Sequence, residues 1–175
     1  ILRLIGPIVH SNPSAVAAFD MALYDILGKA AGLPVYRLLG GGDRTRFATD
    51  ITVSLETPEN MAAEAKTYAV RGYRTIKVKV GQGVALDEAR IKGIREAVGD
   101  KVDLRIDANQ GWTVPQAKEA LGRLSAYRIQ FCEQPVAAWD TAGLREVRSE
   151  SPVPIMADEA VFGAPDAVKL IRADA

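Results

Sequence analysis

One lysine and three carboxylates recur along this sequence at nearly even intervals. Lys79 is followed by Asp107, Glu133 and Asp158, at steps of 28, 26 and 25 residues. Each lies at the end of a short apolar stretch that resembles a β-strand. A step of this length accommodates one strand, one helix and two loops, the repeating unit of a (β/α) barrel. Because functional groups of such barrels gather at the carboxyl ends of the strands, we expect these four side chains to share one site.

The three acids have a chemistry of their own. Carboxylates that converge on one point repel one another and raise each other's pKa values. A divalent cation removes that penalty, and an all-oxygen ligand set suits Mg²⁺ or Mn²⁺. Zinc has little support, because His10 and Cys132 are each the only residue of their type. The competing interpretation pairs the acids with Arg105 and the lysines in buried salt bridges, but three acids at regular strand ends favour the metal site.

Two lysines share one face of the predicted strand over residues 75–81. Side chains alternate across a strand, so Lys77 and Lys79 point one way while Val78 and Val80 point the other. A lysine crowded by a second lysine and a metal has a lowered pKa, which prepares it to accept a proton. We assign Lys79 as the catalytic base and Lys77 as its electrostatic partner. Together with the metal, such a base could remove the proton next to a carboxylate through an enediolate.

The elements that must position these residues follow two patterns. Residues 1–48 read as helical, with a helix that starts after Asn12 and stops near Gly32. From residue 49 onward strands alternate with helices, and Thr113 followed by Gln116 has the form of a capping box. Strands are expected over residues 50–55, 75–81, 101–108, 128–134 and 154–158. This alternation predicts an α/β fold with a parallel sheet and right-handed crossovers.

Bulk properties exclude several classes of protein. The 175 residues carry 22 basic and 22 acidic side chains, with no basic excess of the kind that nucleic-acid binders show. No apolar run approaches the roughly 20 residues needed to span a bilayer. A single cysteine excludes an internal disulfide and fits a reducing compartment. The sequence therefore predicts a cytoplasmic enzyme without nucleic-acid or membrane partners.

Four ordered motifs resemble the enolase superfamily, in the muconate-lactonizing branch of the mandelate racemase group, whose members use a Lys or His base with Mg²⁺. They are Lys77-Val78-Lys79, Asp107-Ala108-Asn109-Gln110-Gly111-Trp112, Glu133-Gln134-Pro135 and Ala157-Asp158-Glu159. The resemblance implies Asp107, Glu133 and Asp158 as Mg²⁺ ligands, and Lys79 as an acid/base partnered by Lys77. Asn109 and Glu159 would lie beside the ligands rather than among them.

The resemblance also implies an architecture. Residues 18–25 are similar to the helical part of the family's capping domain. Residues 1–48 would form the end of that domain, and residues 49–175 the first half of a modified TIM-type barrel with its first five strands.

Within the branch, the chain looks most like a dipeptide epimerase of the L-Ala-D/L-Glu type, an isomerase. Muconate cycloisomerase, o-succinylbenzoate synthase and N-acylamino acid racemase are the alternatives, and a catalytically inactive metal-binding fragment is the alternative from another class. The substrate would be a small carboxylate, and we expect a homo-oligomer.

One departure from the family pattern stands out. Members place a second lysine on the sixth barrel strand, opposite the first, and the sequence ends before that strand. Epimerisation needs an acid/base on each face of the carbon, and a five-stranded piece of barrel would leave an open edge. The expectation from sequence is a fragment with little epimerase activity by itself.

Overall fold

The computed structural model describes residues 12–42 and 46–175. The chain divides into two compact units, residues 1–48 and residues 49–175. In the first unit, α2 (Pro13–Ala31) is followed by the short α3 (Val35–Leu38). The Asn12 side chain accepts a hydrogen bond from the Ala15 amide, and Gly32 ends α2 in a left-handed conformation with φ 65°. The helix that the sequence predicts is thereby confirmed at both ends.

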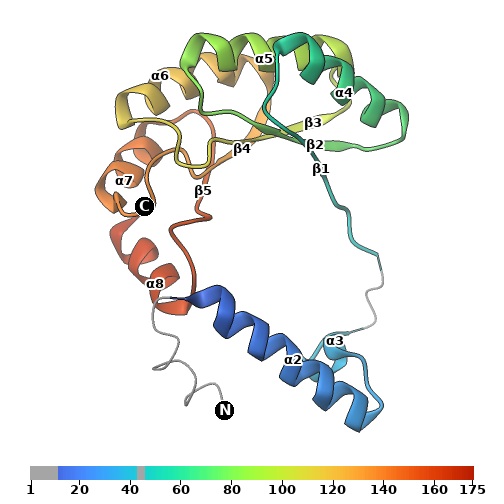
Figure 1. Ribbon diagram of the computed structural model, residues 1–175. Helices are drawn as coiled ribbons and strands as arrows, with labels where there is room; N and C mark the ends of the chain where they lie inside the picture. Colours follow the sequence, from blue (N-terminus) through green and yellow to red (C-terminus); the bar gives the residue numbers. More distant parts are fainter. Residues whose placement is uncertain (1–11, 43–45) are drawn as a thin grey trace. The chain divides into compact units, whose positions relative to one another are not determined.

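The second unit contains one sheet of five strands (Figure 1). These are β1 (Ile51–Val53), β2 (Thr75–Lys79), β3 (Asp103–Asp107), β4 (Ile129–Glu133) and β5 (Ile155–Met156). Their order in the sheet is the order in the sequence, and every neighbouring pair is parallel. This is the arrangement of successive barrel strands, so the α/β expectation is confirmed.

A helix follows each strand, and these helices lie along one face of the sheet (Figure 1). They are α4 (Pro58–Val70), α5 (Val84–Val98), α6 (Val114–Leu124) with the 3₁₀ turn η1 (Ser125–Tyr127), α7 (Thr141–Glu150) and α8 (Ala164–Ala173). The predicted capping box is present, since Thr113 and Gln116 bond reciprocally at the start of α6.

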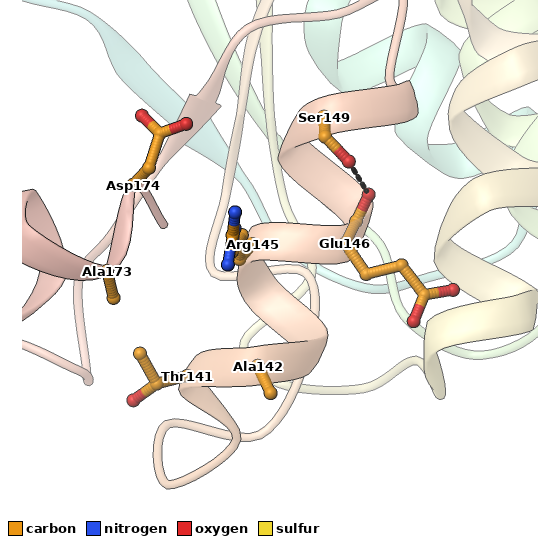
Figure 2. A pocket seen from close by; sticks show the side chains of 7 residues that line it. All are labelled: Thr141, Ala142, Arg145, Glu146, Ser149, Ala173 and Asp174. Atoms are coloured by element: carbon orange, nitrogen blue, oxygen red, sulfur yellow. Dashed lines mark hydrogen bonds between the residues drawn. The ribbon is translucent and has the colours of Figure 1, made fainter.

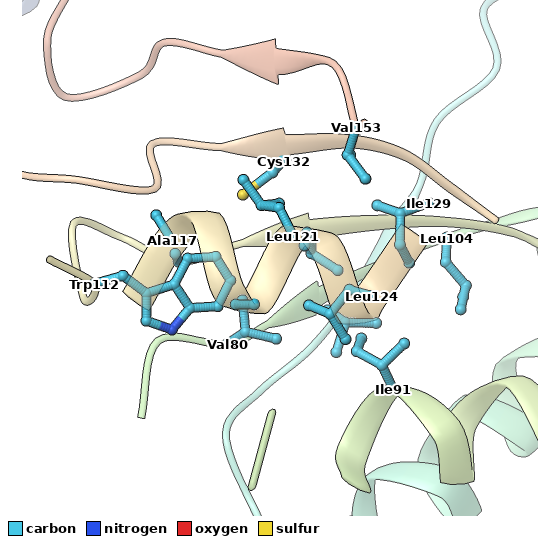
Figure 3. Packing of buried hydrophobic residues seen from close by; sticks show 14 of the residues in the cluster. Val80, Ile91, Leu104, Trp112, Ala117, Leu121, Leu124, Ile129, Cys132 and Val153 are labelled. Carbon is cyan, nitrogen blue, oxygen red and sulfur yellow. The ribbon is translucent and has the colours of Figure 1, made fainter. Parts of the chain in front are cut away.

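The apolar core fills the space between this sheet face and the helices (Figure 3). Val78, Ile106 and Cys132 of the strands are fully buried there, together with Leu121 and Leu124 of α6. The alternation of side chains along each strand therefore leaves the other face to the polar residues. The helices cover one face of the sheet, and the lysines and carboxylates of the candidate site lie on the other.

Within the described residues, no helix combines the length and the apolarity that a membrane crossing requires.

Candidate metal and proton-transfer site

Lys77 joins two of the predicted carboxylates at the carboxyl end of the sheet. Its ammonium lies 2.8 Å from Asp107 Oδ2 and 2.6 Å from Glu133 Oε1. The strand register explains the meeting, because Asp107 is paired with Lys79 on one side and with Glu133 on the other. The Asp107 side chain is fully buried and that of Glu133 nearly so. Two buried acids thus share one cation, which offsets the cost of their burial.

Lys79 makes a separate set of contacts. Its ammonium donates to Asp107 Oδ2 at 2.7 Å and to Asn109 Oδ1 at 2.6 Å. The side-chain Nδ2 of Asn109 in turn donates to Glu159 Oε1 at 3.0 Å. A polar chain therefore runs from Lys79 through Asn109 to Glu159, linking the ends of β2, β3 and β5. Both residues that sequence reasoning placed beside the ligands belong to it.

The pKa values of the two neighbouring carboxylates, Asp107 and Glu133, are shifted in opposite directions. Burial alone raises the pKa of Asp107. Hydrogen bonds from Lys77, Lys79 and the backbone N–H of Asn109 outweigh this effect and hold the pKa of Asp107 below its usual range. Burial dominates at Glu133 and, with the nearby Asp107 charge, raises its pKa. For Lys77, burial acts to lower the pKa, and the bonds to both acids reverse this and raise it. The site thus holds a firmly ionised acid beside one that protonates more readily.

Asp158 stands apart from this cluster. Its side chain is exposed and lies two residues beyond Met156, the register partner of Glu133. Across residues 12–42 and 46–175, no three His, Cys, Asp or Glu side chains are close enough to hold a metal ion jointly. The donor chemistry nonetheless fits Mg²⁺, because carboxylate oxygens from three neighbouring strands are the ligands this ion prefers. The ligand role of Asp107, Glu133 and Asp158 remains a prediction.

Gln134 is a site residue that sequence reasoning did not single out. Its side chain is fully buried, and its Oε1 accepts hydrogen bonds from the backbone amides of Asp158 at 3.0 Å and Ala160 at 3.1 Å. Its Nε2 donates to Val136 O at 2.9 Å. One side chain thus ties the loop after β4 to the loop that carries Asp158. The signal in the sequence was a polar residue directly after a buried strand.

Asp87 is a second residue that the sequence left unassigned. This fully buried carboxylate accepts hydrogen bonds from three successive backbone amides, those of residues 81–83, at 3.0 to 3.2 Å. It also accepts from the Trp112 indole at 3.1 Å and pairs with Arg90 at 3.1 Å. Asp87 therefore fixes the loop after Lys79 against the loop after Asp107.

Backbone strain is concentrated in the loops that follow the acidic strand ends. Asn109, Gln110 and Gln134 all have positive φ, at 41°, 68° and 36°. Non-glycine residues rarely adopt this region unless the surroundings impose it, and such positions cluster at functional sites.

A surface hollow of about 670 Å³ lies elsewhere in this unit (Figure 2). Thr141, Arg145 and Ser149 of α7 face Ala173 and Asp174 across it. None of the predicted site residues lines this hollow.

Comparison with known families matches both parts of the chain. Residues 60–175 match the enolase C-terminal domain-like family, and residues 2–40 match the mandelate racemase / muconate lactonizing enzyme N-terminal domain. An L-Ala-D/L-Glu epimerase of Clostridium acetobutylicum is 43% identical over 174 residues, 98% of this chain and 48% of the relative. A hydrophobic dipeptide epimerase of Enterococcus faecalis is 47% identical over 160 residues, 91% of this chain and 45% of the relative. The chain thus spans about half the length of the curated relatives it matches.

Solved structures agree with these matches. A dipeptide epimerase from Cytophaga hutchinsonii, complexed with Mg and the dipeptide D-Ala-L-Val, superposes with a TM-score of 0.95 at 44% identity, covering 99% of this chain and 47% of that one. An N-succinyl Arg/Lys racemase from Bacillus cereus gives a TM-score of 0.94 at 36% identity, covering 99% of this chain and 47% of that one. The predicted TIM-type barrel strands are therefore those of a known barrel family. The chain belongs to the mandelate racemase and muconate lactonizing enzyme group of the enolase superfamily.

Proposed function

We propose that this chain carries the Mg²⁺ site and one acid/base of an isomerase that epimerises dipeptides by removing the proton next to a carboxylate. The observation that carries the proposal is the lysine–carboxylate cluster, in which Lys77 bonds Asp107 and Glu133 at 2.8 and 2.6 Å and Lys79 bonds Asp107 at 2.7 Å. Curated dipeptide epimerases at 43 to 47% identity support it. Mg complexes of two dipeptide epimerases support the choice of metal.

In this proposal Asp107, Glu133 and Asp158 hold the metal. When bound, Mg²⁺ would neutralise the negative charge that develops on the substrate carboxylate. Lys79 as the neutral amine accepts the proton from the neighbouring carbon, and as the ammonium it returns the proton. Asp107 and Asn109 hold its nitrogen at the open face of the sheet. Lys77, bonded to both acids, sets the local charge and keeps the two carboxylates together.

The two units would divide the work. We assign residues 1–48 to the helical part of a capping domain and residues 49–175 to the half of the barrel that carries the metal site. The match of residues 2–40 to the family's N-terminal domain supports the first assignment.

Solvent deuterium exchange tests the proposal. The complete gene product, loaded with Mg²⁺ or Mn²⁺ in D₂O, is incubated with L-Ala-L-Glu, apolar dipeptides, N-succinyl amino acids and muconolactone, and the α-proton signal is followed by NMR. We expect deuterium to enter the dipeptides, with inversion of one α-carbon. Exchange confined to N-succinyl amino acids would reassign the enzyme to the racemases, to which a relative at 38% identity belongs. Metal binding without exchange in any substrate would leave the non-catalytic alternative and reject the proposal.

A further inference from the structure

Strand β4 contains a β-bulge between Ile129 and Cys132, shortly before Glu133. Between two paired positions, β3 advances two residues, from Leu104 to Ile106, while β4 advances three, from Ile129 to Cys132. One extra residue is therefore inserted into β4. Such bulges re-aim the side chains that follow them and are common beside active sites.

The bulge decides which way Glu133 points. In a regular strand Ile129 and Glu133, four residues apart, would lie on the same face. In this sheet Ile129 is 8% exposed and belongs to the apolar core, whereas Glu133 bonds Lys77 on the opposite face. The extra residue between them shifts the alternation of side chains by one position, so Ile129 and Glu133 point to opposite faces. Without the insertion, the alternation would turn Glu133 toward the helices.

Arg105 contacts both residues of the bulge. Its Nε donates to Gln130 Oε1 at 2.9 Å, and its guanidinium carbon lies 5.1 Å from the centroid of the Phe131 ring. From the other side, its Nη1 bonds Asp50 Oδ2 at 2.9 Å, just before β1. A planar guanidinium can stack on a ring and donate in several directions at once, which an ammonium cannot do. Two side chains on β4 thus face one partner on β3.

We propose that Arg105 is a positioning residue, which stabilises the bulge at Gln130 and Phe131 and so keeps Glu133 on the inner face beside Asp107. The proposal rests on the proposed metal site for its consequence, because only an inward Glu133 could act as a ligand. Arg105 itself bonds neither Asp107 nor Glu133 in any contact described above.

Substitution of Arg105 separates positioning from charge. Arg105 lies two residues from Asp107 along β3, about 7 Å at the usual strand rise. A positive charge there repels a bound cation, so charge removal alone would tighten Mg²⁺ binding. Loss of a positioning residue would instead weaken Mg²⁺ binding. We expect Arg105→Met in the complete gene product to weaken Mg²⁺ binding about tenfold, as loss of partners around metal ligands typically does.

Isothermal titration of Mg²⁺ into metal-free protein measures this directly. Arg105→Lys keeps the charge, and with it the repulsion of the cation, but loses the combined stacking and hydrogen bonding, so it should bind Mg²⁺ at least as weakly as Arg105→Met. The matched control is Arg123→Met, because Arg123 pairs with Glu88 and Glu119 on the outer helices. Its dissociation constant should stay within twofold of the parent. Tighter or unchanged binding in Arg105→Met, or full rescue by lysine, would overturn the proposal.

Amide hydrogen exchange provides a readout that does not depend on the metal. Peptides covering residues 129–134 should exchange faster in Arg105→Met, while those of β2 change little. If Arg105→Met fails to fold, Phe131→Leu takes its place in the experiment. This variant keeps the apolar bulk but removes the ring on which Arg105 stacks, and the same peptides should exchange faster. If the parent protein binds no Mg²⁺, the proposed function fails, and the exchange data alone decide the role of Arg105. Protection of β4 equal to the parent's in a folded variant would reject it.

Discussion

The side-chain oxygen of Gln134 accepts a hydrogen bond from the backbone amide of Asp158 at 3.0 Å. These residues are 24 positions apart and follow neighbouring strands. The bond fixes the backbone of Asp158, while its side chain remains exposed. The same oxygen serves the Ala160 amide, so one buried side chain organises the whole turn after β5.

Gln134→Leu should therefore loosen that turn. The change leaves two amides without their partner, and each unpaired buried group costs about 1–3 kcal/mol. Because both hydrogen bonds are only partly buried, each amide should lose less than a fully buried group does, and urea denaturation of the complete gene product should show a total loss of about 1–3 kcal/mol, together with weaker Mg²⁺ binding by titration. Gln110→Leu is the control, since Gln110 bonds the Ala138 amide at 2.9 Å from an exposed position. Equal stability of the Gln134 variant and its parent would contradict the proposed anchoring.

Lys79→Arg tests the proton-transfer role. Arginine keeps the positive charge next to Asp107 but does not release a proton near neutral pH. Since a positioned acid/base contributes about 10²–10⁴-fold, we expect deuterium incorporation to fall by that factor while the titrated Mg²⁺ affinity stays within a few-fold. Lys66→Arg on the exposed face of α4 should leave both quantities unchanged. Exchange at the parental rate would remove Lys79 from the mechanism.

Part of this site could be predicted from the sequence, because strand alternation is local. Strand alternation and spacing correctly indicated that four side chains meet at the carboxyl end of the sheet, those of Lys77, Lys79, Asp107 and Glu133. The bulge in β4 could not be predicted, since it depends on which residues of β3 face β4. The same holds for Gln134, whose partners lie on the next strand–loop unit. Long-range pairing, rather than local preference, decides these features.

Asp87→Asn should damage the frame around Lys79. Asparagine removes the charge that balances the buried Arg90, and breaking a buried pair typically costs about 3–5 kcal/mol. Denaturation should report this loss. Emission of Trp112, which is 3% exposed and bonded to Asp87, should shift to longer wavelength as the loosened loops admit water to its indole. The measurement needs a Trp139→Phe background, because Trp139 is 83% exposed.

The matched control for this change is Asp100→Asn. Asp100 approaches Arg128 at 3.7 Å with its side chain 77% exposed, so little change is expected. Parental stability in Asp87→Asn would show that the network around Asp87 does not support the loop.

Gly81→Ala should separate the loops after β2 and β3. Gly81 has φ 104°, which disfavours any side chain, and an added Cβ would lie 2.5 Å from Ala108 O. We expect a loss of at least about 1–3 kcal/mol in denaturation experiments. Gly122→Ala is the control within α6, where an added Cβ meets nothing within 4 Å. That change should stabilise the protein by about 0.5–1 kcal/mol. Similar effects from both substitutions would contradict the close approach of the two loops.

Cys132 gives a test of the core behind Glu133. Its thiol is fully buried, and burial raises its pKa well above the usual range. Because the thiolate is the reactive form, the folded protein should resist the disulfide reagent DTNB at pH 8 and react fully in guanidinium. A pKa raised by folding stabilises the protein below the unfolded thiol's pKa of about 8.5, and this contribution is lost as the pH rises. Denaturation between pH 7 and 9.5 should therefore show stability falling more steeply in the parent than in Cys132→Ala. Rapid stoichiometric labelling of the folded protein would show instead that this face of β4 is open to solvent.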